Sequence, residues 1–465
     1  MRKKYDFRPL ISPVIALSAL LLFGAPARSE EAVPPADRQE KPAQARESEK
    51  KTALDAGQIL PGEMITLERS IAIALKKNPQ IVAATGTVDI GRSRVGEARA
   101  NYYPQVSAQA GYTRISPMQS TPTGTFLRLN NYDQYSGSVT VSQNLIDFGK
   151  TSSQVNISKY NLEASRFDLN TTSDQVIFNV KQAYYNVLQS RRSRDVTADI
   201  VKQFQQHLDQ AKGFYEVGTK AKIDVTKAEV DLSNARLNLI RAENAVKISW
   251  IVLNNAMGMP HAPEYTIEDD LAVHKFEITF DDALNRAYEN RPDLKALVAK
   301  REAAQESVGL ARTGHYPELN GSATYGRSGQ ELDSSLDHGW SAGVVLTVPL
   351  FSGFLTSHQV AEAKSNLYVL KANEETLRQQ VLLDIQSAYL NLQQANDSIA
   401  TAELAVQQAQ ENLDLANGRY AAGVGSPIEV TDAFAAYSNA QASYTNALYS
   451  YKIAQASIEQ AMGAR

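Results

Sequence analysis

The strongest constraint on the fold is that the chain contains one pattern of residues twice. The recurring landmarks include Tyr103–Pro104 with Tyr316–Pro317, 213 positions apart, and Ala183–Tyr184 with Ala388–Tyr389, 205 apart. The change of offset indicates one insertion of eight residues, and residues 116–124 read as a loop there because they are rich in Ser, Pro, Thr and Gly. A shared offset over many landmarks predicts two structural repeats, at 62–260 and 275–463.

The N-terminus has the three parts of a cleaved secretory signal. A basic start is followed by an apolar run over 10–23 and then by small residues, so we expect 1–29 to be removed. A retained membrane anchor is the alternative, although the run is short and contains Pro13. Residues 30–60 are rich in Glu, Lys, Pro, Ala and Gln, and we expect a disordered leader there.

Both repeats predict the same order of elements: two helices, two strands and a long helical hairpin. The first helix begins at Thr66 or Thr279 and ends near Pro79 or Pro292. A long helix without Pro or Gly follows the strands, over about 150–211 and again over about 356–417. We expect glycines to break each hairpin before the return helix, namely Gly213, Gly218, Gly418, Gly423 and Gly425.

The composition excludes several classes of protein. The chain has no cysteine and a net charge of -4, so disulfide scaffolds, thiolate metal sites, lipoprotein acylation and basic nucleic-acid binders are not expected. The six histidines show no metal-ligand spacing, and they are expected at surfaces or interfaces. We find no nucleotide motif and no pairing of nucleophile with base, and therefore predict neither an enzyme nor a cofactor.

The four predicted strands alternate apolar and polar residues. In the segment 340–350 one face carries Trp340, Val344 and Leu346, and the segments 135–145, 106–112 and 319–325 alternate in the same way. Such alternation is typical of outer-membrane strands, and also of a soluble half-buried sheet. Four strands cannot close a barrel alone, so a membrane sheet requires copies of the chain: two give eight strands and three give twelve.

The order of these elements resembles the TolC family of outer-membrane efflux channels. The resemblance covers about 62–463 and is carried by the residues at 144–149, 349–353, 289–294, 420–423 and 428–430. It implies an α+β membrane protein: a homotrimer with a shared twelve-stranded barrel in the outer membrane, continued by a periplasmic α-helical barrel. It also implies a passive exit duct joined to a periplasmic adaptor and an inner-membrane pump. A non-conducting periplasmic spacer or adhesin is the alternative.

Two acidic residues stand at the expected tip of the second hairpin. Glu429 and Asp432 are three positions apart on one helical face, whereas the first repeat has Asp224 and Lys227 there. Acids are also ordinary in the first turn of a helix. The resemblance implies that Glu429 and Asp432 form an acidic ring at the periplasmic aperture, where six carboxylates of a trimer attract cations.

Other residues of the tips match the family only in part. The resemblance implies a closed-state latch between Tyr420 and Asp224, but Gly425 stands where the family has an arginine. It also implies an adaptor-docking surface at Val217, Gly218, Thr219, Gly423, Val424 and Gly425. Glycine at these positions is equally the ordinary end of a helix.

Overall fold

The computed structural model describes residues 59, 61–120, 126–128, 130–270, 276–330 and 336–463. The expected signal peptide, 1–29, lies outside the described residues, as does all of the expected leader except Ile59. All described residues belong to one unit of the chain, Leu54–Arg465.

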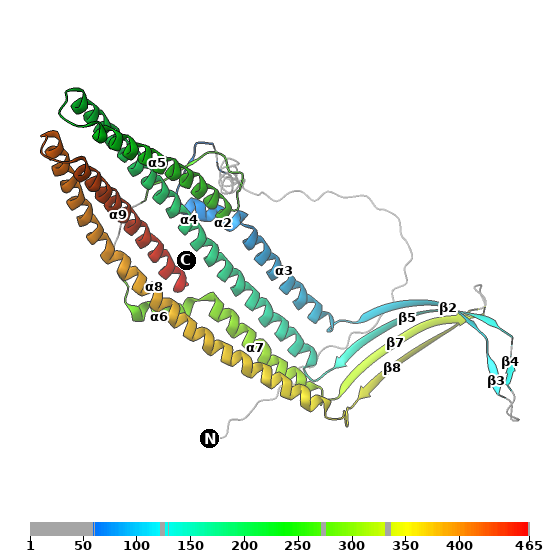
Figure 1. Ribbon diagram of the computed structural model, residues 1–465. Helices are drawn as coiled ribbons and strands as arrows, with labels where there is room; N and C mark the ends of the chain where they lie inside the picture. Colours follow the sequence, from blue (N-terminus) through cyan, green and yellow to red (C-terminus); the bar gives the residue numbers. More distant parts are fainter. Residues whose placement is uncertain are drawn as a thin grey trace, which may run out of the picture. The chain divides into compact units, whose positions relative to one another are not determined.

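Two sets of elements follow one another in the same order (Figure 1). The first set is β1 (Met64–Ile65), α2 (Leu67–Lys77), α3 (Pro79–Ala100), β2 (Gln105–Ile115), β5 (Tyr132–Ile146), α4 (Lys150–Glu216) and α5 (Lys222–Ala256). The second set is β6 (Thr266–Ile267), α6 (Phe280–Asn290), α7 (Pro292–Thr313), β7 (Glu318–Gly329), β8 (Asp337–Thr347), α8 (Leu355–Ala421) and α9 (Pro427–Ala461).

The starts of the short helices are where the sequence predicts them. The hydroxyl of Thr66 accepts a hydrogen bond from the Arg69 amide, and that of Thr279 accepts one from the Asp282 amide. Such N-caps satisfy amides that have no partner inside the helix. Pro79 and Pro292 each open the next helix, where a missing N–H costs nothing.

The long helices are somewhat longer than predicted. α4 and α8 each contain 67 residues, which corresponds to about 100 Å. The prediction that Gly213 and Gly418 break the hairpins is wrong, because both lie inside helices and accept hydrogen bonds from Val217 and Ala422. The breaks occur at Gly218 and Gly423, where φ is positive.

The four main strands form one antiparallel sheet in the order β2-β5-β7-β8. The register aligns the alternating faces across the four strands, except at a shift between Asn144 and Ile146 of β5. One cross-strand row is Val106, Val141, Ala323 and Ala342, and the row beside it on the opposite face is Ser107, Thr140, Thr324 and Ser341. The sheet therefore has one mainly apolar face, with charged residues towards the end away from the helices, and one hydroxyl-rich face.

Both faces of the sheet are open within this chain. Every described residue of β8 is exposed, and Trp340 is 78% exposed. A soluble half-buried sheet would cover its apolar face, so this alternative does not fit. β8 ends at Thr347, short of the predicted Leu350. The predicted loop at 116–124 contains part of a small hairpin that the sequence did not predict, because β3 (Met118–Ser120) pairs with β4 (Phe126–Arg128).

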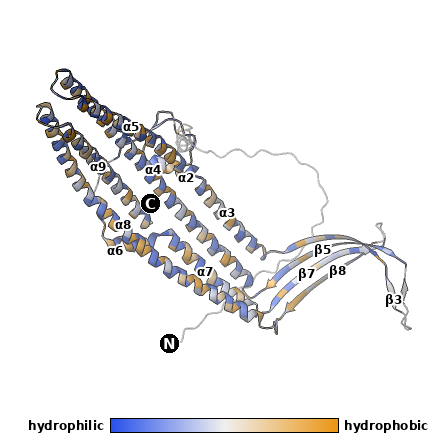
Figure 2. Ribbon diagram, viewed as in Figure 1, coloured by the Kyte–Doolittle hydropathy of each residue, from blue (hydrophilic) through white to orange (hydrophobic). Residues whose placement is uncertain are grey.

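No helix among the described residues has an apolar stretch long enough to cross a membrane. Figure 2 shows polar residues along every long helix.

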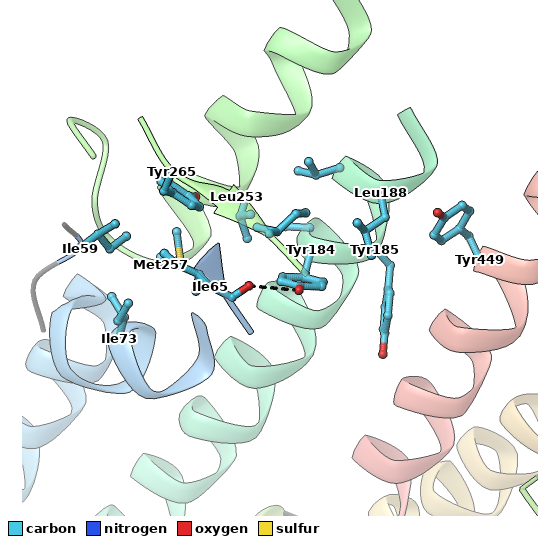
Figure 3. Packing of buried hydrophobic residues seen from close by; sticks show 13 residues of the cluster. Ile59, Ile65, Ile73, Tyr184, Tyr185, Leu188, Leu253, Met257, Tyr265 and Tyr449 are labelled. Carbon is cyan, nitrogen blue, oxygen red and sulfur yellow. Dashed lines mark hydrogen bonds between the residues drawn. The ribbon is translucent and has the colours of Figure 1, made fainter. Parts of the chain in front are cut away.

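A core cluster joins the first described residues of the chain to the middle of α4 (Figure 3). Tyr184 is fully buried, and its hydroxyl lies 2.7 Å from the Glu268 carbonyl and 3.3 Å from the Ile65 carbonyl. It therefore holds the ends of β1 and β6, a parallel pair that the sequence did not predict. Ile73, Leu253 and Met257 complete the packing around it.

We predict that Tyr184→Phe lowers the stability of this region. The substitution keeps the packing but leaves the Glu268 carbonyl without its donor, and a typical hydrogen bond contributes about 1 kcal/mol. The midpoint of urea unfolding, followed by circular dichroism, should fall. Tyr185→Phe is the matched control, because Tyr185 is also buried but its hydroxyl makes no hydrogen bond with the described residues. An equal midpoint for both variants would contradict the role of the Tyr184 hydroxyl.

Candidate functional site

The tips of the two long hairpins have the same backbone geometry. Gly218 and Gly423 both have φ of +76°, which glycine adopts without steric cost. The next amides turn back onto the helix ends: Thr219 donates to the Phe214 carbonyl at 3.0 Å, and Val424 donates to the Arg419 carbonyl at 3.1 Å. This arrangement closes the last turn of each helix.

The predicted docking residues are therefore the residues of these two turns. Val217 and Val424 are 71% and 70% exposed, so each tip presents an apolar side chain. Thr219 is also exposed, but its hydroxyl is used within the turn, where it donates to the Phe214 carbonyl at 2.9 Å. Gly425 differs from the others because it is buried.

Tyr420 is a packing residue between the hairpins. Its side chain is fully buried, with ring centroids 4.9 Å from His207 and 5.7 Å from Phe214, both of α4. Burial raises the pKa of Tyr420, and the nearby carboxylate of Asp224 raises this pKa further. Within the described part of the chain, the Tyr420 hydroxyl has no hydrogen-bond partner. The two predicted latch residues are thus close enough to interact electrostatically, but they share no hydrogen bond.

Lys220 makes a polar contact between the two tips. Its Nζ donates to the Gly425 carbonyl at 3.3 Å and lies 5.3 Å from the centroid of the Tyr420 ring. A cation over an aromatic face is attracted by the ring quadrupole. Lys220 and Gly425 occupy equivalent positions in the two repeats, because they are 205 residues apart.

The geometry of the second tip explains why position 425 is a glycine. A Cβ at this position would lie 2.8 Å from the Tyr420 nitrogen and 2.9 Å from the Arg419 carbonyl carbon, both of which are backbone atoms. The Gly425 amide also donates to the Arg419 carbonyl at 2.9 Å. An arginine does not fit this turn, so the position expected to carry a latch arginine instead accepts a hydrogen bond from Lys220.

The two acids of the second tip lie at the start of α9. Ser426 caps this helix and accepts from the Glu429 amide. The Nε of Arg419 lies 3.2 Å from Oε2 of Glu429, but both side chains are well exposed, so this ion pair adds little stability. Asp432 is exposed, and no ion pair or hydrogen bond holds its carboxylate among the described residues. The acids are therefore open to solvent.

A polar network joins the hairpins beyond the tips. Nζ of Lys227 lies 3.4 Å from both Asp231 and Thr431, and the Thr431 hydroxyl donates to Asp231 at 3.0 Å. Phe204 of α4 and Phe434 of α9 also contact each other between the hairpins, with ring centroids 4.8 Å apart and the rings tilted by 41°. Lys227 thus connects α5 with α9.

Sequence reasoning missed Lys220, Arg419 and His207. The first two were detectable in part, because the repeat alignment pairs Lys220 with Gly425 and the turn brings Arg419 near Glu429. His207 was expected at a surface or interface, and it lies in the interface between the hairpins. No set of three His, Asp or Glu residues in the described part of the chain is arranged to hold a metal ion.

The fold is that of an outer-membrane channel subunit. The chain resembles the Campylobacter jejuni CmeC outer membrane channel, with a TM-score of 0.75 at 18% identity over 94% of each chain. It also resembles CusC, with a TM-score of 0.76 at 16% identity over 88% of this chain and 95% of the other. The predicted combination of long helices with a few strands is confirmed by these structures.

The sequence matches the model of the family described as outer membrane efflux protein, over residues 71–259 and 283–464, and the chain belongs to this family. It is 25% identical to the outer membrane protein TolC of Escherichia coli K12 over an alignment of 405 residues that covers 83% of this chain and 80% of that protein. It is also 25% identical to protein CyaE of Bordetella pertussis, over 79% of this chain and 78% of that protein. The family consists of channels rather than enzymes, and the protein is an exit duct of efflux or secretion in the outer membrane.

We predict that acid weakens the packing of the two hairpins through His207. Burial lowers the pKa of this residue; Lys227 lowers it further, while Asp231 and Asp224 oppose the shift. The Tyr420 ring covers it from α8. A lowered pKa means that the packed state holds neutral His207. The packing is thus fully stable above the unfolded pKa of about 6.5 and loses at most about 1.4 kcal/mol per pH unit below it.

Urea unfolding of the helical region between pH 8 and pH 5 measures this effect. His207→Phe should flatten the pH dependence, since phenylalanine binds no proton. His358→Phe is the control, because His358 is exposed on α8, and it should keep the wild-type dependence. A wild-type slope that persists in His207→Phe would contradict the assignment.

Proposed function

We propose that three copies of this chain form one duct, with a shared twelve-stranded barrel in the outer membrane and an α-helical barrel in the periplasm. The support comes from the sheet. Its edge strands, β2 and β8, have no partner strand on their outer sides within the described residues. Membranes do not tolerate unpaired backbone groups in contact with lipid, so the sheet requires neighbouring copies to close it.

The two faces of the sheet suit the two sides of a barrel wall. The apolar face, with Val106, Val141, Val344 and Leu346, would contact lipid, and the hydroxyl-rich face would line the lumen. α4 follows β5 after only three residues, and α8 follows β8 closely. In this proposal the helices therefore continue the wall into the periplasm.

The hairpin tips form the periplasmic mouth in this proposal. Three copies bring six exposed carboxylates together, from Glu429 and Asp432 of each chain, and these attract cations and bind divalent ions. Lys220 joins the first tip to the second, and Tyr420 with Asp224 supports the same closed arrangement. The exposed Val217 and Val424 suit an apolar contact with a periplasmic adaptor, which in turn connects the duct to an inner-membrane pump.

The single observation that carries the proposal is the sheet with one apolar and one hydroxyl-rich face and two open edges. Its test is the current through purified protein in a planar lipid bilayer. Stepwise conductance by trimers is expected. Folded, inserted protein without any current, even when the mouth is destabilised as described below, would favour a structural spacer and overturn the proposal.

We predict that Glu429→Ala combined with Asp432→Ala reduces cation selectivity. Removing six carboxylates from the mouth lowers the local negative potential, so the reversal potential in a salt gradient should move towards zero. The concentration of divalent cations that blocks half of the current, added on the side of the helical tips, should rise at least about tenfold. This corresponds to a loss of about 1.4 kcal/mol in the free energy of ion binding.

A matched control for this pair is Glu97→Ala, which removes an exposed carboxylate from α3, on the strand side of the helical part. It should leave both selectivity and divalent block unchanged. Equal effects of the control and the double variant would mean that the acids at 429 and 432 are not the charge filter.

We predict that Lys220→Met increases the conductance of the closed duct. The substitution keeps an unbranched side chain of similar length but removes the hydrogen bond to Gly425 and the cation over Tyr420. Longer or larger open steps should appear in single-channel records. Lys222→Met removes the same charge from an exposed position two residues away and should behave as wild type. Unchanged steps in Lys220→Met would show that the closed state does not depend on this contact.

A further inference from the structure

The apolar face of the sheet contains a groove with a cation at its edge. The groove has a volume of about 740 Å³ and is lined mainly by apolar atoms of β2, β5 and β7. Its floor is made of the short residues Ala110 and Gly137, which are cross-strand partners. Larger side chains stand around this floor, namely Tyr112, Tyr135, Val139 and Tyr325.

The register explains why the surface is hollow here. Ala110, Gly137 and Arg327 form one cross-strand row on the apolar face. The row on one side contains Tyr112 and Tyr135, whose ring centroids are 5.2 Å apart. Two small residues between bulky neighbours leave a groove across the strands.

Arg327 is a charged member of this row, and no described residue supplies an anion for it. It is exposed, it lines the groove, and it makes no ion pair or hydrogen bond with any described residue. The other arginine on this face, Arg114, differs because it lies 3.9 Å from Asp133. Asp133 also accepts a hydrogen bond from Tyr112 at 2.9 Å. An unmatched guanidinium beside an apolar groove is complementary to an anionic head group with an acyl chain.

The position of Arg327 along the strand fits one leaflet of the membrane. β7 follows α7, so Glu318 is at the helix-side end of the strand and Arg327 is nine residues further on. Nine residues extend over about 30 Å, or about 24 Å along the membrane normal at a usual barrel tilt. That is the height of the apolar band of an outer-membrane barrel. Since the helices lie on the periplasmic side, Arg327 is at the outer boundary.

We infer that this groove binds a phosphorylated, multi-acyl glycolipid of the outer leaflet. One acyl chain lies over Ala110 and Gly137 between the tyrosines, and the guanidinium of Arg327 pairs with a head-group phosphate. This site rests on the proposed orientation of the sheet in a barrel. It adds a lipid ligand to the duct, at a surface separate from the mouth.

Native mass spectrometry of the purified full-length protein tests the site, with diphosphoryl lipid A and its phosphate-free counterpart as probes. Wild-type protein should retain the phosphorylated probe more strongly. Arg327→Gln should weaken retention of that probe about fivefold, the effect of one basic residue worth about 1 kcal/mol. Arg327→Lys should restore most of it. Arg114→Gln is the control and should bind as wild type.

Gly137→Leu tests the groove independently of charge. A Cβ at Gly137 has only the Gln109 carbonyl oxygen near it, at 4.0 Å, so the sheet accommodates a side chain there. The leucine fills the groove and should weaken both probes equally. Unchanged binding in both Arg327→Gln and Gly137→Leu would overturn the inference. Displacement of the lipid by millimolar inorganic phosphate would also overturn it, because it would indicate a site for free anions.

Measuring the conductance of the same preparations distinguishes a failure of the lipid-site inference from a failure of the proposed function. If all variants conduct and none differs in lipid retention, only the lipid site fails. If no variant conducts, including Lys220→Met, the proposed duct fails whatever the lipid result.

Discussion

The unpaired edges of the four-stranded sheet are the constraint on which the rest of the structure depends. β2 and β8 each leave one row of backbone groups without a partner strand in the described chain, and such groups are costly in lipid. Copies of the chain are the direct way to satisfy them. Because the register keeps the two faces aligned across the four strands, apart from a shift between Asn144 and Ile146, closing the sheet also separates a lipid surface from a lumen.

Most of the fold was predictable because its signals are periodic or repeated. Thr66 and Pro79 mark helix starts, and alternation from Trp340 onward marks a strand. The β1–β6 pair was not predictable, since two-residue strands have no period. The prediction that Gly213 ends its helix was wrong because a glycine favours a helix end where the backbone needs a positive φ. Gly218 has a positive φ, and Gly213 does not. The site was predictable by position, whereas the contact of Lys220 with Tyr420 depends on how two separate hairpins pack.

Duplication followed by divergence explains the chemistry of the tips. The two turns have the same backbone geometry, but equivalent positions now differ: Lys220 faces Gly425, and Lys227 corresponds to Asp432. At these two pairs of equivalent positions, the first hairpin has the lysines and the second has a glycine and an acid. The small residue at 425 leaves its carbonyl accessible to the lysine of the first repeat. A symmetric pair of tips, with two lysines or two glycines, would lack this contact.

In the proposed duct, the charged side chains of the tip and the neutral wall of the strand region have different roles. On the hydroxyl-rich face, the charged side chains Glu318 and Asp337 stand at the ends of strands, and the row of Ser107, Thr140, Thr324 and Ser341 between them is neutral. Such a wall, in the proposed barrel, offers hydrogen bonds without preferring either sign of charge. The exposed acids of the helical tip are about 100 Å of helix away, far beyond the Debye length of about 8 Å at physiological ionic strength. In the proposed duct, selection by charge therefore occurs at the tip, because the described residues between the strand ends carry no charged side chain on the hydroxyl-rich face.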